Sequence, residues 1–97
     1  MKTINIILYT SRSSQGVMID NIVAFTVELL RKIYSISVVY NVVYDNIDVP
    51  YLIIDNMPPL YLYDPPEIDT LINVVRAVYD IYSLEPSGID SVAISEV

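Results

Sequence analysis

Cysteine, histidine and tryptophan are all absent from this 97-residue chain, and glycine occurs only twice. Without cysteine the chain forms no disulfide, no thiolate zinc site and no redox couple. Without histidine it lacks the usual acid or base near neutral pH, and its serines have no histidine partner for a catalytic triad. We therefore expect no catalytic residue, no metal site and no cofactor, and a protein that is not an enzyme.

Basic residues are also scarce. Five lysines and arginines face twelve aspartates and glutamates, which gives a net charge of −7. Such a surface repels the phosphates of nucleic acids and anionic lipids. No apolar run approaches the ~20 residues that span a bilayer, and residues 1–5 lack the layout of a signal peptide. We expect a cytoplasmic protein that binds neither nucleic acid nor membranes.

Hydrophobic residues make up 54% of the sequence, and many are β-branched, which favours a core that contains a sheet. The continuous apolar run 3–10 predicts a first strand buried on both faces. Residues 35–44 give the strongest strand signal, with neither glycine nor proline. Two short strands, 51–55 and 60–63, flank a proline-containing turn, which predicts an antiparallel hairpin.

Two helices are predicted from apolar residues that recur at helical spacing. The first covers 17–34, and its apolar surface is wider than one sheet face can cover. The second covers 65–82, with Asp64 as the N-cap, Pro65 at the first helical position and Glu67 as the acid of a capping box.

The predicted fold is α/β, with the order β-α-β-β-β-α and a four-stranded mixed sheet. Residues 1–84 form a single domain of a size that one core can support. Residues 85–97 are a C-terminal tail, which forms either a short added strand or a frayed end. Four aspartates near strand or turn ends are expected to act as turn residues or caps rather than metal ligands: Asp45, Asp48, Asp55 and Asp64.

Several features resemble the thioredoxin and glutaredoxin folds over residues 4–82. A strand ends in Tyr9-Thr10 followed by Ser11, Val49-Pro50 opens the third strand, and the order of elements is similar. The resemblance implies a thioredoxin-like sandwich in which the peptide bond before Pro50 is cis. It also implies that the redox motif would fall at residues 14–17, where no cysteine stands.

The resemblance is to a trimmed member of these folds. Only residues 45–48 remain where the second helix of the family would be, and they are too few to form it. Thiol–disulfide exchange is impossible without cysteine. The chain therefore resembles a redox-inactive member, and its cysteine-free, isoleucine- and tyrosine-rich composition resembles proteins of thermoacidophilic archaea and their viruses.

We expect this protein to act in protein–protein interaction or assembly, because nine tyrosines and a wide apolar helix exceed the needs of one small core. A homodimer through the second strand or the first helix is predicted, with the interface residues Val38, Tyr40, Val42, Tyr44 and Val27. The alternative is that residues 89–94 fold back and cover the exposed surface within one chain.

A second function stays open at this point. Ser14, Gln15 and Gly16 stand at the start of the first predicted helix, where a small anion or a glutathione-like ligand could bind beside Pro50. Two features weigh against a glutathione-like ligand. Domains of the glutathione-transferase type hold the ligand carboxylate at a helix N-terminus where this chain has the acidic residues Asp64 and Glu67, and the helical domain that completes those enzymes is absent.

Overall fold

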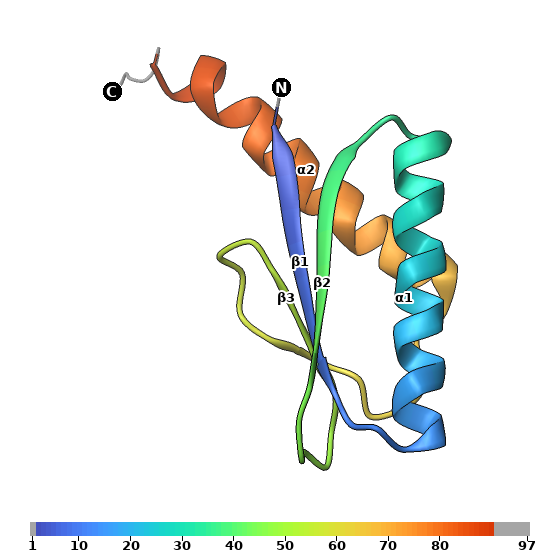
Figure 1. The fold of residues 1–97 in the computed structure, drawn as a ribbon. Helices are drawn as coiled ribbons and strands as arrows, with labels where there is room; N and C mark the ends of the chain where they lie inside the picture. The colour runs from blue at the N-terminus through green and yellow to red at the C-terminus, as the bar shows by residue number, and fades with distance from the viewer. Residues whose placement is uncertain (1, 91–97) are drawn as a thin grey trace.

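The computed structural model describes residues 2–90, and the side chains of residues 2–81. The elements follow the predicted order β-α-β-β-β-α (Figure 1). They are β1 (Thr3–Thr10), α1 (Ser14–Lys32), β2 (Ser37–Tyr44), β3 (Tyr51–Ile54), β4 (Leu60–Tyr61) and α2 (Ile68–Asp90). The predicted α/β class with a four-stranded mixed sheet is confirmed.

The strands lie in the order β2-β1-β3-β4. β1 pairs in parallel with β2 and antiparallel with β3, and β3 and β4 form the predicted antiparallel hairpin. A parallel pair needs a crossover connection, which α1 supplies. Residues 45–50 then carry the chain from β2 past β1 to β3 without a helix.

Both helices pack on one face of the sheet (Figure 1). The even-numbered residues of β1 point toward them, and Ile4, Ile6 and Leu8 are at most 2% exposed. They join α1 and α2 side chains such as Leu30 and Val75 in one core. No helix covers the opposite face within residues 2–90, and we call this opposite side the open face.

The open face corrects the prediction that the first strand is buried on both sides. The odd-numbered positions of β1 face away from the helices: Asn5 is exposed, and Ile7 and Tyr9 are only partly buried. The run looked continuous because these two positions are apolar as well, so the sequence did not show a difference between the faces.

α1 begins at Ser14, three residues before its predicted start. Ser13 is the N-cap, and its side-chain oxygen accepts a hydrogen bond from the backbone N–H of Gly16 at 3.0 Å. A Cβ atom at Gly16 would lie 2.2 Å from the carbonyl oxygen of Ser11. Only glycine therefore allows the helix to pack so close to the preceding loop.

α2 begins at Ile68, so the predicted capping box at residues 64–67 is wrong. Asp64 and Pro65 each precede a proline, and a residue before proline is disfavoured in helical conformation. The first helical turn instead starts from the carbonyl of Glu67, which accepts from the N–H of Leu71 at 3.1 Å. The helix runs to Asp90, eight residues beyond its predicted end, and residues 91–97 of the predicted tail lie outside the described residues.

The peptide bond before Pro50 is trans, as are the others in residues 2–90. The expectation of a cis bond at this position, which the thioredoxin resemblance implied, is therefore wrong. The order of elements and the absence of a helix between β2 and β3 agree with the expected layout, but the proline geometry does not.

Asp55 ends β3 and fastens it to β1. Its φ of 51° is in the left-handed region, so the chain turns away from the sheet. Its N–H donates to the carbonyl of Asn5 at 2.8 Å, and its carboxylate Oδ1 accepts from the N–H of Asn5 at 2.9 Å. The N–H of Asn5 thus bonds to the side chain of Asp55 instead of to the backbone carbonyl of Asp55, as it would in a regular antiparallel ladder.

We predict that Asp55→Ala lowers the free energy of unfolding by about 2 kcal/mol, from the lost acceptor and the strain of alanine at positive φ. Asp55→Asn keeps an acceptor oxygen and tolerates this φ, and its amide nitrogen takes the place of the carboxylate Oδ2, which is buried without a partner. We expect Asp55→Asn to lose less stability than Asp55→Ala in urea unfolding. Asp80→Ala, at an exposed position on α2, is the control. Equal losses in both Asp55 variants would contradict this role.

Candidate functional site

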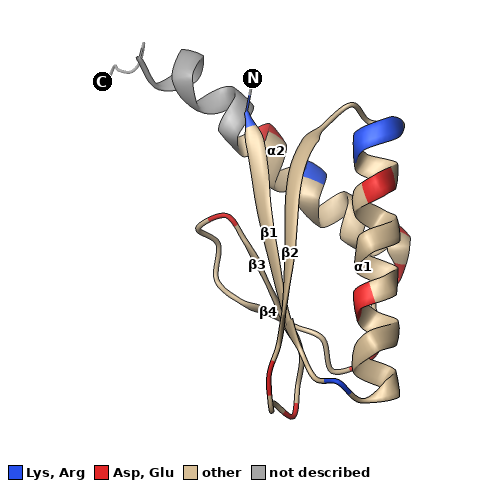
Figure 2. Ribbon diagram, viewed as in Figure 1, with Lys and Arg blue, Asp and Glu red and all other residues tan. Residues whose placement is uncertain are grey.

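Acidic residues lie in both layers of the fold (Figure 2). Asp45 and Asp48 lie in the loop between β2 and β3, and Asp55 lies at the end of β3. Three of the five basic residues lie on the helices: Arg31, Lys32 and Arg76. The loops that border the strand layer are therefore mainly acidic.

β2 is an edge strand of eight residues, whereas the opposite edge strand, β4, has only two. The N–H of Asp45 donates to the carbonyl of Thr10 in β1, so the backbone N–H and C=O groups of odd-numbered residues in β2 point toward β1. These groups alternate in direction along a strand, so those of Tyr40, Val42 and Tyr44 point outward, away from β1. They have no hydrogen-bond partner among the described residues. We call this stretch, residues 40–44, the free edge.

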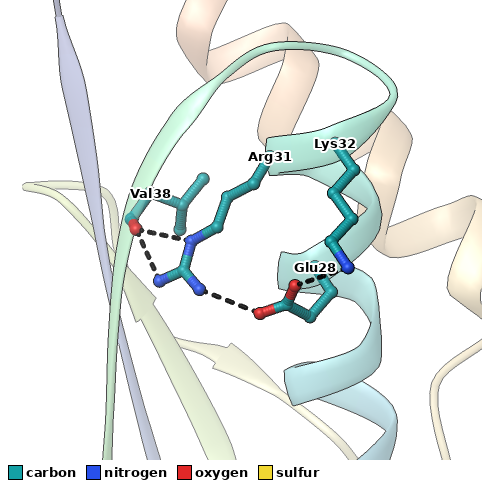
Figure 3. Close-up of polar contacts among 4 residues, drawn as sticks. All are labelled: Glu28, Arg31, Lys32 and Val38. Carbon is teal, nitrogen blue, oxygen red and sulfur yellow. Dashed lines mark hydrogen bonds and ion pairs between the residues drawn. The ribbon is translucent and has the colours of Figure 1, made fainter.

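Arg31 blocks the first part of this edge. Its guanidinium Nε and Nη2 donate to the carbonyl of Val38 at 3.1 and 2.8 Å (Figure 3). Glu28 holds the guanidinium in place through an ion pair at 3.1 Å, and it also pairs with Lys32 at 3.7 Å. Covering an edge carbonyl with a charged side chain is a common way to limit strand addition. Pairing with another strand is thereby confined to residues 40–44.

Asp20 of α1 fixes the free edge from the helix side. Its two carboxylate oxygens accept hydrogen bonds from the hydroxyl of Tyr40 at 2.6 Å and from the hydroxyl of Tyr44 at 2.7 Å. Charge-assisted bonds of this length are strong, and two of them from residues four apart on one side of the strand restrain the strand against the helix. The free edge is therefore partly ordered before any partner arrives.

Both tyrosines are kept protonated. Burial, together with the hydrogen bond and the negative charge of Asp20, raises the pKa of Tyr40 well above its usual 10.0. The hydrogen bond to Asp20 is the main cause that raises the pKa of Tyr44, and the guanidinium of Arg12, 5.2 Å from its ring centre, opposes the rise. A phenol that resists ionisation is a poor nucleophile or base at neutral pH, so this cluster has the chemistry of a structural support.

The open face carries side chains in rows across the strands. The register places Val43, Tyr9, Tyr51 and Tyr61 side by side, one from each strand. The rings of Tyr9 and Tyr51 stack with centroids 4.8 Å apart, those of Tyr51 and Tyr61 are 5.5 Å apart, and Tyr63 continues the series at 6.2 Å. We call these four tyrosines the tyrosine row.

Apolar side chains continue behind the tyrosine row. Ile7 and Ile53 form the next row with Asn41, and Val39 follows at 44% exposure. No residue of the described strands that faces this side between Thr3 and Ile54 is charged. The sequence pattern did not predict this surface.

A cavity of about 120 Å³ lies at the start of α1. Its lining includes Gln15, Gly16 and Pro50, so three of the four predicted ligand-binding residues meet there, whereas Ser14 does not line it. Pockets for ligands of drug or cofactor size are about 300–1,000 Å³, so this cavity is too small for a glutathione-like molecule. Asp48 also lines it and disfavours an anion.

The predicted interface residues divide between core and surface. Val27 and Val38 are only 2% and 5% exposed in the single chain, so their side chains belong to the core. Tyr40, Val42 and Tyr44 are partly exposed and form the free edge, with their side chains on the helix side. The outer side of β2 carries Ser37 and Asn41 besides Val39 and Val43, so half of its positions are polar, a difference that the strong strand signal of the whole segment concealed.

Among the side chains of residues 2–81, no three acidic groups are close enough together to hold a metal ion. No helix within residues 2–90 is long and apolar enough to cross a bilayer.

We predict that Asp20→Asn brings the pKa of Tyr40 and Tyr44 back toward 10.0, because the negative acceptor is lost. In the wild type, the raised tyrosine pKa values add folding stability that is fully present below pH 10 and is lost as the pH rises further. Asp20→Asn should therefore lose less stability than the wild type between neutral and alkaline pH. Ultraviolet titration of tyrosinate measures the shift, with Tyr40→Phe and Tyr44→Phe to assign it. An unchanged titration in Asp20→Asn would show that Asp20 does not control these groups.

No protein-family model matches the chain, and comparisons with curated proteins and with solved structures likewise find no match. We therefore infer function from the residues of the chain itself.

Proposed function

We propose that this protein is not an enzyme and works by binding other protein chains, first a second copy of itself through the free edge. The observation that carries the proposal is the row of outward backbone groups at Tyr40, Val42 and Tyr44, which have no partner among residues 2–90. A row of unpaired N–H and C=O groups is a template for another strand.

The free edge lacks the features that usually prevent such pairing. It contains no proline, glycine or charged residue, and the strand shows regular pairing with β1 along its whole length. Two identical edges related by a two-fold axis pair antiparallel, which would join two four-stranded sheets into one of eight. Arg31 stops this pairing before Val38, so the contact has a defined length.

The chemistry of the described side chains supports a binding role. The two clearly shifted ionisable groups, Tyr40 and Tyr44, shift toward the unreactive protonated form. The cavity beside α1 is small, and its N-cap serine already accepts the N–H of Gly16. We do not base the proposal on the thioredoxin resemblance, because the bond before Pro50 is trans.

We predict that wild-type protein is a dimer and that Val42→Pro is a monomer. Proline removes the outward N–H and obstructs an approaching strand, but an outward edge position tolerates it within one sheet. Val42→Thr keeps the N–H and the branched side chain and should remain a dimer. Light scattering measures the mass of each, and circular dichroism confirms that both variants are folded.

Hydrogen exchange gives a second measurement that needs no substitution. The amides of Tyr40, Val42 and Tyr44 should become protected as protein concentration rises, whereas those of Val39 and Val43, which point toward β1, should be protected throughout. Wild-type protein that is monomeric at all concentrations, or a dimer in which these three amides still exchange rapidly, would contradict pairing through the free edge.

A further inference from the structure

The open face is a second surface, separate from the free edge. The side chains that line it stand on the opposite side of the sheet from the helices, whereas the free edge is a line of backbone groups. Tyr61 is 50% exposed and Tyr63 75%, and Val39 and Val43 are 44% and 38% exposed. A sheet with helices on one side only keeps an apolar face that another layer can cover.

The size of this face limits what can cover it. Four strands about 4.8 Å apart, with about 3.3 Å per residue over the longest strands, give a face on the order of 15–20 Å by 26 Å. That is about 500 Å² at most, less than the ~800 Å² per partner of a standard interface between two globular proteins. A single helix, about 10–12 Å wide with its side chains, fits these dimensions.

The charge around the face limits the occupant further. Asp45 and Asp48 lie in the loop at the end that carries the tyrosine row, where Arg12, beside Tyr44, is one positive charge against two negative ones. The carboxylate of Asp55, at the far end of β3, already binds the N–H of Asn5. The faces of tyrosine rings also attract cations. Two copies of this chain meeting face to face would bring acidic borders together, whereas a basic partner would meet them with opposite charge.

We propose that the open face binds an amphipathic helix of a partner protein, with an apolar stripe on the strands and lysines or arginines along its borders. The apolar stripe covers Ile7, Ile53 and the tyrosine row, and the basic residues reach Asp45 and Asp48. This inference rests on the proposed function in one respect, that the protein acts by binding proteins. It names the class of partner.

Synthetic peptides of about 18 residues, ~27 Å long as a helix, test the proposal with full-length protein. One has a leucine stripe with lysine at the other positions, one has glutamate in place of lysine, and one has the leucines and lysines scrambled. We expect the striped lysine peptide to bind at least about tenfold more tightly than the other two, because only it supplies both a stripe and positive charge. Calorimetry measures the affinities.

Two matched variants locate the binding site. Tyr61→Ser removes a half-exposed aromatic ring from the open face, and Phe25→Ser removes one of similar exposure, 54%, from α1 on the other side. Tyr61→Ser should weaken binding by about tenfold or more, as expected for an aromatic anchor, and Phe25→Ser should leave it within about twofold. Amide chemical shifts should change at Ile7, Tyr9, Tyr51 and Ile53.

Several results would overturn the proposal. These are equal binding of the three peptides, no binding of any, shift changes confined to the helices, or a greater loss in Phe25→Ser than in Tyr61→Ser. Dimerisation that Tyr61→Ser abolishes would identify a second copy as the occupant. Nuclear Overhauser contacts between residues 91–97 and the tyrosine row in the free protein would identify the chain's own end as the occupant. A dimer through the free edge that fails to bind the peptides would leave the proposed function intact and reject this inference alone.

Discussion

Residues 45–50 join β2 to β3 at one end of the sheet, and the arrangement of both surfaces depends on this connection. β2 is parallel to β1 and β3 is antiparallel to it, so the end of β2 and the start of β3 lie at the same end. The chain passes β1 there without crossing either face. The one connection that must run the length of the sheet is the parallel crossover from β1 to β2, and α1 occupies it on one face. α2 contacts α1 on that same face. This path of the chain therefore leaves one face of the sheet, the open face, and the outer edge of β2, the free edge, uncovered within the described residues.

β1 lies between β2 and β3, and its side chains alternate between the helix side and the open face. The two sides therefore contribute unequally to the stability of the isolated chain. Ile4 and Leu8 are fully buried under the helices, and burial of such a side chain contributes about 1.5–3 kcal/mol. Ile7 and Tyr9, on the other side of the same strand, are buried only in part by neighbouring strands. They contribute less of this free energy in the isolated chain, and a partner that covers them would recover the rest. The strand is thus stable alone and still has apolar surface to give to an interface.

The sequence predicted the order of elements and the bounds of β1 because apolar runs and turns give local signals. It misplaced the start of α2 because the capping pattern at Asp64 and Glu67 was weighed without the effect of Pro66 on Pro65. It also placed Val27 and Val38 at an interface, since α1 and β2 have apolar residues on more than one side and only the packing decides which side is inner. The bond of Arg31 to the carbonyl of Val38 likewise depends on where β2 passes α1. Such contacts between distant segments have no local pattern in sequence.

The free edge and the open face are compatible in one assembly. Antiparallel pairing of two β2 strands requires a two-fold axis perpendicular to the sheet, and such an axis keeps both open faces on the same side. The joined sheet would then present two tyrosine rows on one continuous surface, with all the helices behind it. A contact of about 500 Å² per chain is at the size of weak, transient interfaces. Two such contacts on a rigid dimer can bind one two-helix partner far more tightly than either contact alone, because the second contact forms within the complex. Pairing at the edge would therefore turn a weak binding face into an effective one, and the support that Asp20 gives to Tyr40 and Tyr44 would contribute to recognition without touching the partner.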